Sequence, residues 1–295
     1  MAIIVNKETS FIIQGITGKQ GQVHARLCLE YGCKLVGGVT PGKGGETVEG
    51  LPVFNTVEEA IDSCGEINAS MILVPPFGVK DSAIEAMDNG IKTIIPITEY
   101  VPVKDTIGMR EYAQDVGATI IGPNTIGAIS PGKGKIGIMP GFLYSEGNVG
   151  IVSRSGTLTH EVASCLSHMG VGQSTCVGIG GDPVPGASFS DILKMFRDDS
   201  ETKCVILIGE IGGVGEELAA EYLKIEKYNK PVFAFIAGNT APAQKKMGHA
   251  GAIIAGNSGT ARSKRDALEA AGVIVAKTLE ELLNLTSETI NDKIN

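Results

Sequence analysis

The 295-residue chain is short of several residue types, and each shortage excludes a class of protein. It contains no tryptophan, only 5% aromatic residues and four histidines. Its 33 acidic residues outnumber 25 lysines and arginines, and the sequence has none of the basic stripes that nucleic-acid binding requires. No apolar run reaches the ~18 uninterrupted residues of a membrane span. We therefore expect neither a nucleic-acid partner nor a membrane.

The six cysteines form no C-x-x-C pair, and they form no cluster with histidine at metal-site spacing. Most lie in apolar stretches, such as Cys204 in KCVILIGE, as expected for small buried residues in a reducing compartment. The N-terminus, MAIIVNKETS, lacks the charged start and long apolar core of a secretory signal. The sequence thus predicts a cytoplasmic protein that itself binds no metal.

Glycine is abundant, with 40 residues at an ordinary hydrophobic content of 43%. Short apolar runs alternate with amphipathic segments along the whole chain, which is typical of parallel sheets covered by helices. We predict an α/β fold of two doubly wound parallel-sheet domains. The first is Rossmann-like and spans 1–122, and the second is flavodoxin-like and spans 123–295. Within the second, the Gly- and Pro-rich stretch 123–148 is expected to be a connection and 287–295 a frayed tail.

A glycine turn, GITGKQG at 15–21, follows the first predicted strand and opens the first helix. Backbone N–H groups in that position cradle phosphates, although G-x-x-G-x-x-G is a weak dinucleotide fingerprint. The second strand runs into GGVTPGKGG, which carries Lys43 where an NAD site has a carboxylate. Thr17, Lys19 and Lys43 are expected at one sheet edge, which favours a ligand with an extra phosphate, either NADP or coenzyme A. A flexible surface loop is the alternative, and the chain has no P-loop motif for ATP.

Three polar segments follow predicted strands of the second half: SRSGTLTHE (153–161), EIGGVGEE (210–217) and the histidine of GHAG, His249. The carboxyl ends of parallel strands share one sheet edge, and helix N-termini there favour anions. We expect two such helix starts to face His249, which suits an imidazole that becomes phosphorylated. Glu210 would hold its other ring nitrogen. His160, in the first turns of a helix, could face the same site, and an incidental histidine in a glycine turn is the alternative.

Seven motifs in this order resemble the α subunits of succinyl-CoA synthetases, from about residue 3 to about residue 285: GITGKQG, GGVTPGKGG, LPVFNTV, GIVSRSGTLT, CVGIGGDP, IGEIGG and MGHAGAII. The resemblance implies a CoA-binding first domain and a ligase second domain. It implies reversible formation of succinyl-CoA through a phosphohistidine and an acyl phosphate. ATP or GTP, with Mg²⁺, would bind a separate β subunit of ATP-grasp fold, in an αβ or α₂β₂ assembly.

The resemblance also assigns roles to individual residues. His249 matches the phosphorylated histidine and Glu210 its carboxylate partner. The helix start that holds the phosphate corresponds to Ser155, Gly156 and Thr157. The matches to CoA contacts are Thr17, Gly18, Lys19, Gln20, Lys43, Ile97, Thr98 and Glu99.

Three departures from the family pattern concern the substrates. His160 stands where the family has a tyrosine that contacts the acid-binding region. The family's PNCPG is PNTIG here, and V-P-A-P-F is shortened to VPPF, closer to malate-using relatives. The same mechanism with malate or citrate is therefore one alternative to succinate. An NADP-dependent dehydrogenase and a non-catalytic CoA-binding module are alternatives of other classes.

Overall fold

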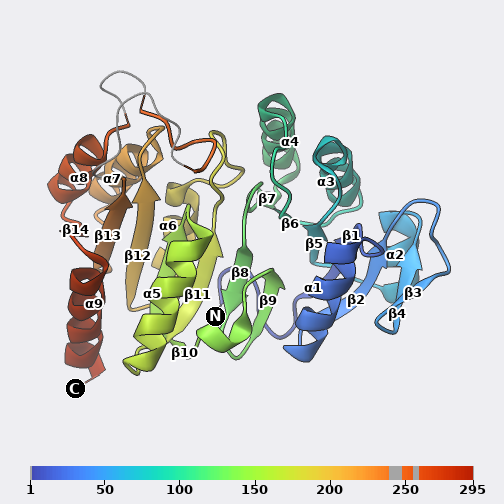
Figure 1. Cartoon of the computed structure of the whole chain (residues 1–295), viewed down its shortest axis with the longest axis horizontal. Helices are drawn as coiled ribbons and strands as arrows, with labels where there is room; N and C mark the ends of the chain where they lie inside the picture. Colours follow the sequence, from blue (N-terminus) through green and yellow to red (C-terminus); the bar gives the residue numbers. More distant parts are fainter. Residues whose placement is uncertain (1, 239–247, 255–258, 295) are drawn as a thin grey trace.

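The computed structural model describes residues 2–238, 248–254 and 259–294. Two seven-stranded sheets lie side by side, one built from each half of the chain (Figure 1). The first has the order β3-β4-β2-β1-β5-β6-β7 and is parallel except for β3. Its strands are β1 (Ser10–Gln14), β2 (Lys34–Val39), β3 (Thr47–Val48), β4 (Leu51–Phe54), β5 (Ala69–Ile72), β6 (Thr93–Pro96) and β7 (Thr119–Ile120).

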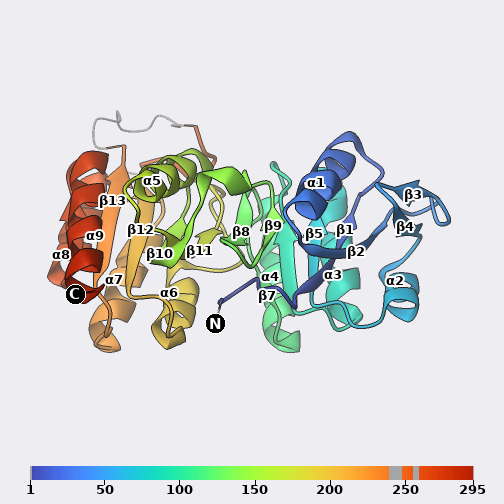
Figure 2. The same cartoon turned by 90° about the horizontal axis from the view of Figure 1, so that it is seen from below.

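Helices cover both faces of this first sheet (Figure 2). α1 (Lys19–Glu30) lies on one face. The other face carries α2 (Val57–Cys64), α3 (Val79–Asp88) and α4 (Val103–Val116). The central strands β1 and β5 are buried along their whole length, because helices pack on both sides of them.

The second sheet has the order β14-β13-β12-β10-β11-β8-β9, and its first five strands run parallel. Those strands are β10 (Glu146–Ser153), β11 (Gln173–Gly178), β12 (Cys204–Glu210), β13 (Val232–Ala237) and β14 (Ile274–Ala276). One face carries α5 (Gly156–His168) and α9 (Leu279–Ile294). The opposite face carries α6 (Phe189–Asp198), α7 (Gly215–Ile225) and α8 (Ala261–Ala270). The predicted α/β class with two doubly wound sheets is confirmed.

The stretch expected to be an irregular connection contains two strands, β8 (Gly127–Ser130) and β9 (Gly134–Gly137). They form an antiparallel hairpin, and β8 also pairs antiparallel with β11. A Cβ at Gly127 would lie 2.1 Å from the Ile136 carbonyl oxygen, so glycine here allows two backbones to approach. The glycine density that suggested a loop therefore reflects close strand packing. The domain division near residue 122 stays a prediction.

Residues 287–294, which belong to the stretch expected to be a frayed tail, are helical in the structure, because α9 continues through Ile294. The Thr278 side chain accepts a hydrogen bond from the Glu281 N–H (3.1 Å) at the start of this helix, and Ile290 near its end is buried. A polar sequence can continue a helix when one face still finds an apolar neighbour. No helix in the described ranges combines the length and apolar character needed to cross a bilayer.

Each sheet has a point where the chain reverses its direction of strand addition. In the first sheet this switch point lies between β1 and β5, and in the second it lies between β10 and β12. Loops that leave the carboxyl ends of such a strand pair diverge to opposite faces and open a crevice, where ligands bind in this fold class. The two switch points locate the candidate site.

Candidate active site

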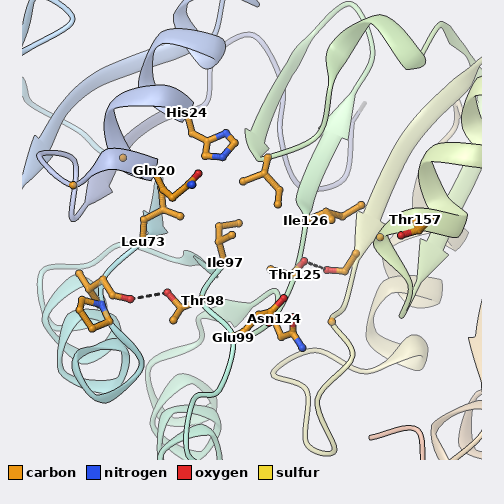
Figure 3. A pocket seen from close by; sticks show the side chains of 18 of the residues that line it. Gln20, His24, Leu73, Ile97, Thr98, Glu99, Asn124, Thr125, Ile126 and Thr157 are labelled. Carbon is orange, nitrogen blue, oxygen red and sulfur yellow. Dashed lines mark hydrogen bonds between the residues drawn. The ribbon is translucent and has the colours of Figure 1, made fainter. Parts of the chain in front are cut away.

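A cavity of about 810 Å³ opens where the two halves of the chain meet (Figure 3). Segments that follow β1, β5 and β6 line it from the first half, and segments that follow β10 and β11 line it from the second. Both switch points thus contribute to one cavity. Its polar lining side chains are Lys19, Gln20, His24, Thr98, Glu99, Asn124, Thr125, Arg154, Thr157, His160 and His249.

The glycine turn after β1 lines the cavity through Gly18, Lys19 and Gln20. Gln20 lies at the upper left in Figure 3. Gly18 is the N-cap of α1, and no side chain caps the helix, so its first backbone N–H groups remain available to an anion. The turn is tight, because a Cβ at Gly21 would lie 2.4 Å from the Gly15 carbonyl oxygen. This geometry fits the predicted phosphate cradle.

Two predicted CoA contacts of the same region are not among the cavity-lining residues. The Thr17 hydroxyl hydrogen-bonds that of Thr40 (3.2 Å), which ties the turn to the end of β2. Lys43 extends along its own loop and pairs with Glu46 at 3.0 Å, with both side chains about half exposed. An ion pair this exposed is weak, so it leaves Lys43 able to exchange partners. Contact of Thr17 and Lys43 with CoA remains a prediction.

We expect Gly21→Ala to weaken CoA binding selectively. The added methyl must push the α1 turn apart and so move its backbone N–H groups out of position for a phosphate. We expect a rise in Kd of roughly tenfold, about 1.4 kcal/mol of binding free energy. Calorimetric titration with CoA measures it. Gly108→Ala is the matched control, because that helical position in α4 meets only the flexible end of Lys80, at 3.4 Å. Unchanged CoA affinity in Gly21→Ala would contradict the assignment of this turn.

The loop after β6 supplies the predicted contacts Ile97, Thr98 and Glu99, and all three line the cavity. The Thr98 hydroxyl donates to the Val74 carbonyl oxygen at 2.7 Å, which joins this loop to the one after β5 (Figure 3). The two loops therefore form one wall opposite the second domain.

His249 lies at the second switch point, where it hydrogen-bonds Glu210, and Glu210 in turn forms an ion pair with Arg154. Its Nδ1 is 2.7 Å from Glu210 Oε2, and Glu210 Oε1 is 3.5 Å from Arg154 Nε. The Glu210 and Arg154 side chains are only 9% and 7% exposed, whereas His249 is 33% exposed. A buried carboxylate requires a counter-charge, which Arg154 supplies. The predicted pairing of His249 with Glu210 is present.

The hydrogen bond to the Glu210 carboxylate raises the pKa of His249 above the ordinary histidine value, and partial burial of the ring opposes this rise. The Glu210 carboxylate accepts a hydrogen bond from Nδ1–H, so the neutral ring carries its proton on Nδ1 and its lone pair on Nε2. The ring rests on Gly181, where a Cβ would lie 2.5 Å from the His249 Cγ. The site therefore fixes both the orientation and the tautomer of this histidine.

Gly156 and Thr157 at the start of α5 line the cavity, whereas Ser155 is not among the lining residues, and a phosphate contact of all three stays a prediction. Ser155 is the N-cap, and its side chain accepts from the Leu158 N–H (3.3 Å). The second helix start expected at His249, that of α7, is not among the lining residues. A carboxylate in its first turn, Glu216, instead binds the backbone N–H of Glu210 at 3.0 Å.

His160 also lines the cavity, one turn into α5. Its Nδ1 is 2.6 Å from the Tyr144 hydroxyl, and burial lowers the pKa of this histidine. Burial raises the pKa of Tyr144, so both groups are neutral at physiological pH. A contact of His160 with the acid substrate remains a prediction.

Four further site residues were not anticipated: Arg154, Asn124, Asp182 and His24. Arg154 donates from Nη2 to the Asp182 carbonyl oxygen at 2.9 Å, and the Asp182 carboxylate accepts from the Asn124 side chain at 2.9 Å. Arg154 and Asp182 lie inside the SRSG and IGGDP motifs, so a charged residue within a glycine turn was the available signal. His24 lies one turn after Gln20 on the cavity side of α1 (Figure 3).

Two family models match the chain, a CoA binding domain over residues 6–100 and a CoA-ligase over residues 152–274. The chain is 53% identical to subunit alpha 2 of succinate–CoA ligase (ADP-forming) from Archaeoglobus fulgidus, over 98% of this chain and 100% of that subunit. This chain belongs to the alpha subunits of succinate–CoA ligases. It is 55% identical to the Aquifex aeolicus alpha subunit, over 93% of this chain and 90% of the relative. The predicted family and its class of enzyme, an acid–CoA ligase, are confirmed.

A solved structure shares the fold of this succinate–CoA ligase alpha subunit. The ATP citrate lyase from Methanothrix soehngenii, in complex with citrate and coenzyme A, superposes with a TM-score of 0.90 at 24% identity. The match covers 98% of this chain and 51% of that one, so the chain spans about half the length of the lyase. At this identity the likeness shows a shared fold, and it says nothing about which substrate this chain uses.

Proposed function

We propose that this chain is the alpha subunit of an enzyme that forms succinyl-CoA from succinate and CoA, reversibly, through a phosphohistidine at His249. One observation carries the proposal. His249 is oriented by a buried carboxylate at Nδ1, and it lines the same cavity as the α1 turn and the α5 start. A nucleophile, an anion-binding helix start and a second phosphate cradle thus share one space.

In the first half-reaction, the Nε2 lone pair of His249 attacks the γ-phosphorus of a nucleoside triphosphate, and the bond to the leaving diphosphate breaks. The ring then carries positive charge, which Glu210 stabilises through the Nδ1 proton. The phosphoryl oxygens carry negative charge, for which the Gly156 and Thr157 N–H groups and the Arg154 guanidinium are available. The residues present therefore fit a phosphorylated imidazole.

In the second half-reaction, a succinate carboxylate oxygen attacks phosphorus and the N–P bond breaks, which returns the lone pair to Nε2. The CoA sulfur then attacks the acyl carbon of the acyl phosphate. The acyl C–O bond breaks, inorganic phosphate leaves, and the thiol proton passes to a phosphate oxygen. In this scheme Gly18, Lys19 and Gln20 hold CoA phosphates at α1, and Thr98 and Glu99 border the path to His249.

The nucleotide and its Mg²⁺ belong, in this proposal, to a partner β subunit of ATP-grasp fold. The sequence has no P-loop, and the described residues contain no group of three or more His, Cys, Asp or Glu side chains placed to hold a metal. Mg²⁺ in such sites binds through carboxylates and substrate phosphates, where it neutralises phosphoryl charge. The alpha-subunit names of the relatives support a partner. Six free cysteines fit the reducing cytoplasm that the sequence predicts.

The test is the intact mass of the chain, co-expressed with its β subunit, after incubation with ATP or GTP and Mg²⁺. We expect one acid-labile phosphoryl group that maps to His249. Succinate plus CoA should discharge it, whereas malate or citrate plus CoA should not. Discharge by malate or citrate alone would transfer the same mechanism to another acid. The absence of any phosphoryl group under all conditions would refute the phosphohistidine, and CoA binding would then be the remaining activity.

A further inference from the structure

Next to the Glu210 backbone lies a buried ion pair that does not line the cavity and that the proposed mechanism does not use. Lys264 of α8 and Glu216 of α7 bond through Nζ and Oε2, and both side chains are 0% exposed. Two charges removed completely from water are costly unless each has well-placed partners. Glu216 has a second partner, because its other oxygen, Oε1, accepts the Glu210 backbone N–H at 3.0 Å.

The hydrogen-bond pattern of β12 explains why Glu210 needs that acceptor. On one side, β12 follows β13 to its end, where the Ile211 N–H donates to the Ala237 carbonyl oxygen. On the other side, pairing with β10 ends earlier, at Ser153 and Ile208, because β10 turns into α5. The Glu210 N–H points to this side, where no strand remains to accept it. A buried N–H without an acceptor is strongly disfavoured, and Glu216 satisfies it.

The strand makes room for this carboxylate at Gly209. A Cβ at that position would lie 2.6 Å from Glu216 Oε1 and 2.7 Å from its Cγ. The carboxylate therefore packs directly against the strand end that carries the His249 partner. Lys264 balances its charge, and Glu217 lies 3.4 Å from the same ammonium as a second carboxylate.

We infer that Glu216, held by Lys264, is a positioning residue for catalysis: it anchors the Glu210 backbone so that the Glu210 carboxylate holds His249 in its reactive orientation. The inference rests on the proposed function, because it assigns a role within the same phosphohistidine site. It predicts that loss of the anchor impairs phosphoryl transfer and leaves CoA binding intact, since the α1 turn follows β1 of the first sheet and Glu216 packs against β12 of the second.

The test compares two double variants in the complex with the β subunit. Glu216→Leu with Lys264→Met removes both charges and the acceptor, whereas Glu216→Gln with Lys264→Met removes the charges and keeps an acceptor oxygen. We expect the first to lower kcat and the rate of His249 phosphorylation about tenfold, with the KM for CoA unchanged, since small misplacements of catalytic groups reduce rate rather than substrate affinity. The second should stay within about threefold of wild type.

Two further variants isolate the contact. Gly209→Ala keeps both charges, but its methyl must displace the Glu216 carboxylate together with the Cδ1 atom of Ile236, which lies 2.8 Å away. It should therefore show the same loss of kcat even if the leucine variant does not fold. Glu217→Gln is the matched control, because it removes the second carboxylate beside Lys264 without touching Glu210. A loss in Glu217→Gln equal to that in the leucine variant would overturn the inference, as would a folded leucine variant with wild-type kcat.

Titration of the His249 ring by NMR in the complete chain gives a readout that does not depend on turnover. The charged groups that act on this ring are Glu210 from β12, Arg154 after β10 and Glu99 after β6. A displaced Glu210 raises the ring pKa less, so the leucine variant should titrate at lower pH than wild type. An unphosphorylated wild-type enzyme would refute the proposed function, and this titration would still decide whether Glu216 positions Glu210. An unchanged ring pKa in the folded leucine variant would overturn the positioning role.

Discussion

His249→Asn is expected to lower succinyl-CoA formation by about 10³-fold or more, because an amide cannot form the covalent intermediate that divides the reaction into two steps. Asparagine retains part of the shape and a hydrogen-bonding group toward Glu210, so the fold should be preserved. The measurement is steady-state turnover with saturating succinate, CoA and nucleotide, in parallel with intact mass after nucleotide and Mg²⁺ alone. Neither a phosphoryl group nor significant turnover should remain.

His168→Asn is the matched control for this substitution. His168 is exposed at the end of α5, and its Nδ1 lies 2.7 Å from the Ser164 carbonyl oxygen of the same helix. Its replacement should leave turnover and phosphorylation at wild-type values. Normal acyl-CoA synthesis by the His249→Asn enzyme would exclude a phosphohistidine mechanism, whatever the family membership of the chain.

Glu210→Gln should have the second largest effect, a loss of about 100-fold in the rate of His249 phosphorylation. A glutamine cannot stabilise positive charge on the ring, and its amide can turn an N–H group toward Nδ1 and select the wrong tautomer. The substitution also leaves Arg154 buried without its carboxylate, so a fall in Tm is expected with it. Rapid-quench measurement of phosphohistidine formation separates the rate effect from stability.

The pH dependence of the Glu210→Gln enzyme follows from the pKa of His249. The hydrogen bond from Glu210 raises that pKa, and only the neutral ring has an Nε2 lone pair, so wild-type phosphorylation increases as pH rises through the raised value. Without the carboxylate the ring deprotonates at lower pH. The acid limb of the rate profile should therefore shift toward lower pH while the maximum falls. An acid limb that stays in place would assign it to a group other than His249.

Local sequence patterns were sufficient for most of the secondary structure of this alpha subunit. Buried strands such as β1 and β5 are continuous apolar runs, and the Thr56 cap on α2 accepts from the Glu59 N–H as its spacing predicts. Hairpin β8–β9 was missed because its four-residue strands are rich in glycine, and because β8 pairs with a strand far along the chain, Ile129 with Cys176 of β11. Short strands that depend on distant partners leave little local pattern.

The candidate site divides in the same way. Strand ends and glycine turns are local features, so His249, Glu210 and the helix starts of α1 and α5, for which phosphate binding is predicted, could be placed at sheet edges from sequence alone. The family resemblance then supplied the roles of these residues, and it favoured CoA over NADP as the ligand of the first half of the chain.

Only the tertiary structure decided which charged groups pair in the site and which residues line its cavity. It paired Glu210 with Arg154 and placed the Glu216 carboxylate against the end of β12. It also brought His160 to Tyr144, and it left Lys43 outside the cavity. Each of these contacts joins segments whose spacing in the sequence carries no signal, because burial and counter-charge are set by the packing of several elements at once. The order of strands in two sheets brought both switch points to one cavity, and no local pattern encodes that order.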